Sequence, residues 1–89
     1  MKDTLLSFGF KESELVVCAK TGLLVNIQGT AAPCKKEQLM SIALRADMDG
    51  LPIPENNKDL PYTSQTDFAH MCGHDGHTAT LLATAKALI

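Results

Sequence analysis

Three short apolar runs, separated by glycine or polar residues, most constrain the fold of this chain. They cover Glu14–Ala19, Leu23–Ile27 and Leu39–Ala46, and each has the length of a β-strand. The first two are separated by the turn-like segment Lys20–Gly22, which predicts a β-hairpin. The third is almost continuously apolar, which is typical of a strand covered on both faces in an α/β sheet.

Helical patterns flank these predicted strands. Met1–Phe10 carries apolar residues interrupted at Gly9, which predicts a short helix that ends there. After the third run, Pro52 and Pro54 exclude a regular helix or inner strand. From Asp75 onward apolar residues recur on one helical face, with Asp75 as the predicted N-cap. This order of elements predicts an α/β fold.

Size and charge limit the functions open to the chain. Its 89 residues suffice for one domain, and its net charge of −2 provides no basic field for nucleic acid or anionic lipid. No segment reaches the roughly 18–20 apolar residues that span a bilayer, and the N-terminus lacks a secretory signal. We therefore expect a cytoplasmic chain with no nucleic-acid or membrane partner. The last helix runs to Ile89 without a stop signal, so we expect its domain to be incomplete.

The densest group of chemically reactive residues is His70–His77. It holds all three histidines of the chain together with a thiol and a carboxylate. Thiolate and imidazole suit zinc and other first-row divalent ions. In an extended or turning loop, the spacing of Cys72 and His74 puts both side chains on one side, and Gly73 and Gly76 would let the backbone turn around an ion.

Other interpretations of this cluster stay open. Asp75 and His77 could orient the ligands, but the cluster could also be a loop with surface histidines and a free thiol. Cys72 could be a thiol nucleophile with a nearby histidine as its base. The odd cysteine count argues against a disulfide scaffold. Cys18, in an apolar run, is predicted to be a buried thiol, and Cys34 receives no role.

Carboxylates form a second group after the third apolar run. Asp47 and Asp49 follow the carboxyl end of the predicted strand, where α/β folds usually place their chemistry. They could bind an ion, orient a ligand histidine or pair with Arg45. A solvated acidic turn is the alternative, and Glu55 has the same ambiguity.

Taken together, two segments resemble the M20 peptidase family. They are Arg45–Glu55 (R-A-D-M-D-G-L-P-I-P-E) and His70–Ala79 (H-M-C-G-H-D-G-H-T-A), and the match is closest to the amidohydrolase branch. That branch includes hippurate, N-acyl-amino-acid and indole-acetyl-amino-acid hydrolases. Thr21–Leu23 also resembles a family segment, so the resemblance covers nearly the whole chain. Gly50 and Met71 each stand at a position where the family usually has Ala. Neither departure removes a ligand.

The resemblance implies a mixed-sheet, zinc-aminopeptidase-like catalytic domain. Residues 1–89 would be its N-terminal portion, with the dimerisation domain absent. Cys72 and His74 match metal ligands, with the thiolate bridging two divalent ions of zinc, manganese, cobalt or nickel. Asp47 matches an aspartate that supports the metal site, which implies a catalytic role. Structural or ligand-orienting roles fall to the remaining motif residues: Asp49, Glu55, Asp75 and His77.

The implied activity is hydrolysis of the amide bond of an N-acyl amino acid or peptide-like substrate. In the family, the glutamate base and further ligands lie downstream and are absent from this chain. The chain alone is therefore expected to be inactive and to need the rest of its catalytic domain or a partner chain; family members are often dimeric. The alternative is a non-catalytic structural or interaction subunit derived from an amidohydrolase.

Overall fold

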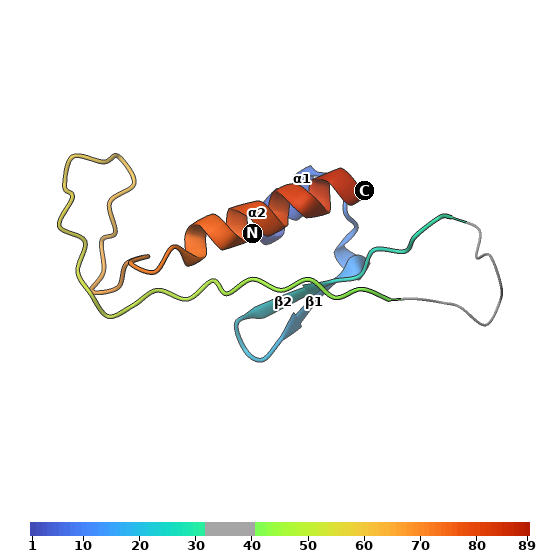
Figure 1. Ribbon diagram of the computed structural model, residues 1–89, viewed down its shortest axis with the longest axis horizontal. Coiled ribbons are helices and arrows are strands. Elements are labelled where there is room, and N and C mark those ends of the chain that lie inside the picture. Colours follow the sequence, from blue (N-terminus) through green and yellow to red (C-terminus); the bar gives the residue numbers. More distant parts are fainter. Residues whose placement is uncertain (32–40) are drawn as a thin grey trace. The chain divides into compact units, whose positions relative to one another are not determined.

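The computed structural model describes residues 1–31 and 41–89 (Figure 1). They fall into two compact units, Met1–Leu44 with Leu82–Ile89, and Arg45–Leu81. No helix in the described part has the length and apolar character needed to cross a membrane. A two-stranded antiparallel sheet and helices confirm the predicted α/β class. In chain order the elements are α1 (Lys2–Ser7), the 3-10 helix η1 (Glu12–Glu14), β1 (Leu15–Cys18), β2 (Gly22–Val25) and α2 (His74–Leu88).

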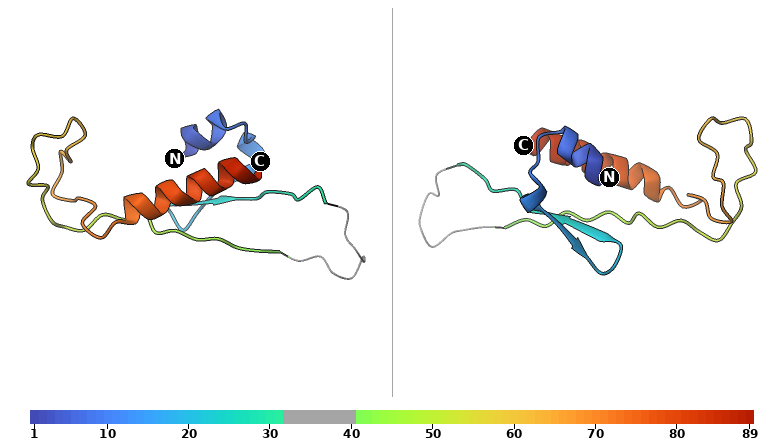
Figure 2. Two further views of the ribbon diagram at one scale, coloured as in Figure 1. Left: turned by 45° about the horizontal axis from the view of Figure 1, so that its top comes forward. Right: turned by 180° about the vertical axis from the view of Figure 1, so that it is seen from behind.

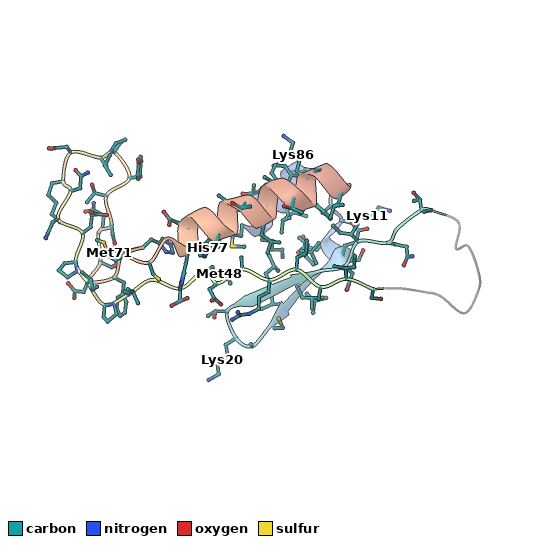
Figure 3. The ribbon with its side chains drawn as sticks, viewed as in Figure 1. Lys11, Lys20, Met48, Met71, His77 and Lys86 are labelled. Atoms are coloured by element: carbon teal, nitrogen blue, oxygen red, sulfur yellow. The ribbon has the colours of Figure 1, made fainter. Side chains whose placement is uncertain are left out.

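Strands β1 and β2 form the predicted hairpin. The strands pair antiparallel, with Cys18 opposite Gly22 next to the turn and Leu15 opposite Val25 at the far end. The turn places Ala19 and Lys20 at φ angles of 47° and 67°, in the left-handed region that disfavours residues with a Cβ. Lys20 extends into solvent at the tip (Figure 3). Gly22 allows the close approach of the two strands, because a Cβ there would lie 2.8 Å from the main-chain oxygen of Cys18.

The core of the first unit is small and lies next to α1. Leu5 and Phe10 are only 2% and 5% exposed. Both views in Figure 2 show α1 beside the C-terminal part of α2. The Lys86 ammonium lies 5.2 Å from the centroid of the Phe8 ring, a favourable cation–π geometry. The predicted short helix is present, and it ends at Ser7, two residues before Gly9.

The prediction of a third strand is wrong for the residues that the structure describes. Residues 41–50 carry no strand, and the Ile42 and Leu44 side chains are 83% and 57% exposed. A strand needs a neighbour that accepts and donates its main-chain hydrogen bonds, and none in the described part pairs with this segment. Leu39 and Met40, the start of the predicted strand, lie outside the described residues.

The second unit contains a closed loop. Leu51 and Ala69 form an antiparallel bridge, with N–H···O distances of 2.9 and 3.0 Å, and Ala69 is buried. Residues 52–68 run between them without a regular helix or strand, as Pro52 and Pro54 predicted for the start of this segment (Figure 1). Side chains of the loop brace it internally; the Thr63 hydroxyl, for example, donates to the main-chain oxygen of Asn57 at 2.6 Å.

Helix α2 begins one residue earlier than predicted. The His77 N–H donates to the Gly73 carbonyl oxygen at 3.1 Å, so Gly73 occupies the capping position. The N-cap prediction for Asp75 is therefore wrong: Gly73, at φ 80°, turns the chain into the helix before the carboxylate is reached. Asp75 lies in the first turn, where its negative charge is favourable to the helix dipole. Gly76 lies within the helix and not in a turning loop.

Candidate functional site

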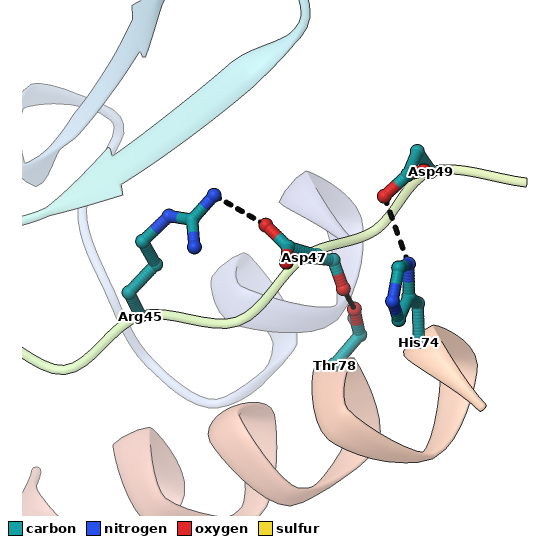
Figure 4. Close-up of polar contacts among 5 residues, drawn as sticks. All are labelled: Arg45, Asp47, Asp49, His74 and Thr78. Atoms are coloured by element: carbon teal, nitrogen blue, oxygen red, sulfur yellow. Dashed lines mark hydrogen bonds and ion pairs between the residues drawn. The ribbon is translucent and has the colours of Figure 1, made fainter. Parts of the chain in front are cut away.

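The second unit holds the acidic segment against the first turn of α2. Asp49 Oδ1 lies 2.8 Å from His74 Nδ1 (Figure 4). The carboxylate is 65% exposed, whereas the imidazole is only 19% exposed. Because an ionised carboxylate can only accept a hydrogen bond, this contact assigns the proton to Nδ1 of His74.

A second contact joins the same segment to the same face of the helix. The Thr78 hydroxyl donates to the main-chain oxygen of Asp47 at 3.0 Å. His74 and Thr78 are four residues apart and therefore lie one above the other on α2 (Figure 4). The sequence interpretation gave Thr78 no role. The signal that could have found it is a hydroxyl one helical turn after a candidate ligand.

The two aspartates of the segment have different partners. The Asp47 carboxylate forms an ion pair with Arg45, one of the roles considered from sequence. Both side chains are largely solvated, at 41% and 83% exposed, so the pair contributes at most about 1 kcal/mol. Asp47 thus reaches α2 through its main-chain oxygen, and the carboxylate that reaches His74 is that of Asp49.

Other residues of the histidine cluster lie around the start of α2. Cys72 is exposed, two positions before His74. The ring centroids of His74 and His77 are 5.9 Å apart, with planes inclined at 30°. Asp75 and His77 are exposed on the first turns of the helix. Figure 3 labels His77 near the start of α2. A thiol, imidazoles and a carboxylate therefore belong to the same unit of the described chain.

The remaining predicted residues have other surroundings. Glu55 lies in the closed loop, where its Oε1 accepts the N–H of Asn57 at 3.1 Å. Cys18 is exposed on β1, so the prediction of a buried thiol is wrong; none of the described residues covers it. Cys34 lies outside the described residues.

The donor set fits a divalent ion in kind but not in number. Cys72 and His74 offer sulfur and nitrogen, and because Nδ1 of His74 contacts Asp49, Nε2 is the ring nitrogen that could bind an ion. A carboxylate on the other ring nitrogen is the usual environment of a metal-binding histidine. Within residues 1–31 and 41–89, however, no three His, Cys, Asp or Glu side chains form a metal-binding group. A catalytic zinc ion typically has three protein ligands, which is more than the described residues bring together.

The thiol-nucleophile interpretation gains no support from the geometry. A nucleophilic cysteine needs a base within hydrogen-bond reach. Among the described residues, no histidine forms a hydrogen bond with the Cys72 thiol.

Comparison with known proteins assigns the chain to a family. Residues 43–89, more than half of the chain and spanning both motifs, match Peptidase family M20/M25/M40. The protein YhaA of Bacillus subtilis (strain 168) is 52% identical over 68 residues, which are 75% of this chain and 15% of that protein. The chain therefore belongs to peptidase family M20/M25/M40, and its α/β elements are those of part of an M20 domain.

Two relatives have names that state an activity. The N-acyl-L-amino acid amidohydrolase of Geobacillus stearothermophilus is 42% identical over 84 residues, covering 94% of this chain and 20% of that protein. The N-acetylcysteine deacetylase of Bacillus subtilis (strain 168) is 44% identical over 70 residues, covering 78% and 17%. The chain thus spans 15–20% of the length of these curated relatives. No solved structure matches it.

Proposed function

We propose that this chain supplies part of the divalent-metal site of an amidohydrolase that cleaves N-acyl amino acids. The observation that carries the proposal is that Cys72, an exposed thiol, stands two positions before His74, whose imidazole is bound to Asp49 through Nδ1. Both residues lie in the segment that matches the family. The names of two relatives, an N-acyl-L-amino acid amidohydrolase and an N-acetylcysteine deacetylase, support the substrate class.

The residues of this chain would bind the ion and hold its ligands in place. A divalent ion supplies Lewis acidity, which polarises an amide carbonyl and activates water. The Cys72 thiolate and Nε2 of His74 would donate lone pairs to it, and Asp49 would hold the imidazole. Sulfur and nitrogen donors are compatible with zinc, manganese, cobalt or nickel.

Turnover requires groups that the described residues do not bring together. All three histidines of the chain lie between positions 70 and 77, and no third ligand joins Cys72 and His74 in the described part. We propose that further ligands and the general base come from the rest of a catalytic domain or from a partner chain. The 89-residue chain alone is then expected to show no amide hydrolysis.

The test replaces Cys72 by Ser in the native protein, purified with any partner that it has. Metal content and the hydrolysis of N-acetyl amino acids are measured together. Removal of a ligand should lower activity by at least about 100-fold and reduce the bound metal. Cys18→Ser, at an exposed thiol on β1, is the matched control and should change neither. Unchanged metal content and activity in Cys72→Ser would refute the proposal.

A second candidate function is that of a non-catalytic interaction subunit. It is favoured by apolar side chains that the described part leaves uncovered, with Val17 at 65%, Ile42 at 83% and Leu88 at 60% exposure. Such surfaces are typical of chains that associate with a partner. Light scattering during gel filtration distinguishes the cases, because a monodisperse monomer without affinity for other chains would contradict this role.

A further inference from the structure

The pair Asp49–Gly50 combines an exposed carboxylate with a residue that lacks a side chain, at a position where this chain departs from the family pattern. We infer that Asp49 is a site of spontaneous isomerisation to isoaspartate. In isoaspartate the main chain continues through the former side-chain carboxyl group. The reaction needs neither a bound metal nor the proposed hydrolase activity.

The isomerisation proceeds in two steps that need no co-reactant other than water. In the first step the main-chain nitrogen of Gly50 bonds to Cγ of Asp49, and the hydroxyl of the carboxylic acid leaves with the amide proton as water. The product is a five-membered succinimide ring. In the second step water adds to one of the two ring carbonyl carbons and breaks its bond to nitrogen. Opening at the original main-chain carbonyl gives isoaspartate with a free α-carboxylate, whereas opening at Cγ restores aspartate.

The structure leaves the reacting atoms accessible to each other. The Asp49 side chain is 65% exposed, and it lies on a segment, residues 41–50, that forms no helix or strand (Figure 4). The Gly50 N–H forms no hydrogen bond with any described residue, so no acceptor holds this nitrogen away from Cγ. Because Gly50 has no Cβ, the nitrogen can approach Cγ without steric hindrance from a side chain.

Other aspartates of the second unit are better protected. The second Asp–Gly pair of the chain, Asp75 and Gly76, lies in the first turn of α2. Ring closure requires rotation about the Cα–C bond of the aspartate, which a helical backbone excludes until the turn opens. Asp67 is followed by Phe68, which carries a large side chain and whose N–H already donates a hydrogen bond of 3.2 Å. We therefore expect Asp49 to isomerise faster than these residues.

Isomerisation would break the link between the acidic segment and α2. It inserts one methylene into the main chain at position 49, between Asp47 and Leu51, which are both held by hydrogen bonds. It also attaches the carboxylate directly to Cα, so the side chain becomes shorter. The carboxylate can then no longer lie 2.8 Å from Nδ1 of His74 on the same backbone path.

The test incubates the native protein near neutral pH for several weeks and digests samples taken at intervals. Mass spectrometry with electron-transfer fragmentation distinguishes isoaspartate from aspartate of equal mass. Isoaspartate should accumulate faster at position 49 than at position 75. Gly50→Ala should lose most of the isoaspartate at position 49, and the structure has room for its Cβ, which would lie 3.5 Å from the Ala69 oxygen. A synthetic peptide of residues 45–52 measures the reactivity of the same sequence without the fold.

Three results would overturn the inference. The first is the absence of isoaspartate at position 49 in the folded protein while the peptide reacts. The second is an equal rate in wild type and Gly50→Ala, and the third is an equal rate at positions 49 and 75. Hydrophobic interaction chromatography then separates the modified protein from the unmodified protein. Hydrogen exchange at the start of α2 should be faster in the modified form, and unchanged exchange would contradict loss of the contact with His74.

Discussion

Asp49 and His74 are 25 positions apart in the chain and are joined by a hydrogen bond of 2.8 Å. Each belongs to a different motif of the family, so the contact links the two motifs physically. The acidic motif provides an acceptor, and the histidine motif provides a ring whose second nitrogen can bind an ion. Four residues further along α2, Thr78 strengthens this link through the main-chain oxygen of Asp47.

Replacing Thr78 by Val should loosen the acidic segment from α2. Valine has nearly the same shape but cannot donate the hydrogen bond to Asp47, which should lower the free energy of unfolding by about 0.5–1.5 kcal/mol. Urea denaturation measures this, and hydrogen exchange should show faster opening at the start of α2. Thr78→Ser keeps the hydroxyl and should retain most of the stability. Equal losses in the two variants would contradict a role for the hydrogen bond.

Two Gly→Ala substitutions should have opposite effects on stability. At Gly50 an added Cβ would lie 3.5 Å from the Ala69 carbonyl oxygen, an ordinary contact, and φ is not positive. Gly50→Ala should therefore be neutral or raise the free energy of unfolding by up to about 1 kcal/mol. At Gly22 the Cβ would lie 2.8 Å from the Cys18 oxygen, so Gly22→Ala should cost at least about 1 kcal/mol. Denaturant titration of both variants measures the two free energies of unfolding. A less stable Gly50→Ala variant than Gly22→Ala variant would refute the prediction.

The hairpin turn offers a stabilising substitution. Lys20 is held at φ 67°, a conformation that glycine adopts without steric strain. Lys20→Gly should raise the free energy of unfolding by about 0.5–1 kcal/mol, measured by thermal or urea denaturation. Thr21 is the matched control in the same turn, because its φ is not positive and glycine there relieves no strain. A gain of the same size in Thr21→Gly would show that backbone strain at Lys20 is not the cause.

Metal should protect one exposed thiol and not the other. Cys18 and Cys72 are both exposed, so iodoacetamide should modify both in the metal-free protein. Bound zinc should slow modification of Cys72 by at least about tenfold, since a coordinated thiolate is a poor nucleophile, and should leave Cys18 unchanged. Mass spectrometry of the peptides measures both sites in one sample. Equal protection of the two thiols would argue against Cys72 as a ligand.

Sequence patterns predicted those elements whose hydrogen bonds are local. The hairpin followed from two apolar runs on either side of a short turn, and it forms with Cys18 opposite Gly22. The prediction of a strand up to Ala46 is wrong over the described residues 41–46. A strand needs a neighbouring strand for its main-chain hydrogen bonds, and an apolar run alone does not provide one. The prediction that Cys18 is buried is wrong for a related reason, because the burial of a strand residue depends on which element covers the hairpin.

The candidate site was predictable in its composition but not in its pairing. Cys72, His74 and the two aspartates stood out by residue type and spacing. Which aspartate meets His74 depends on backbone direction through an irregular segment, and a period of two puts Asp47 and Asp49 on the same side. The structure separates them, with Arg45 as the partner of one and His74 as the partner of the other.

The bridge between Leu51 and Ala69 also has an evolutionary consequence. It brings the two ends of residues 52–68 together, so the segments that lead to Asp49 and to His74 leave from a fixed point. The entropy of closing a loop grows slowly, by only about 0.6 kcal/mol for each doubling of its length. Insertions, deletions and substitutions within 52–68 can therefore accumulate with little effect on the contact between the two motifs. Within the second unit, residues 52–68 are thus the stretch where a change in length should least disturb the register of Asp49 with His74.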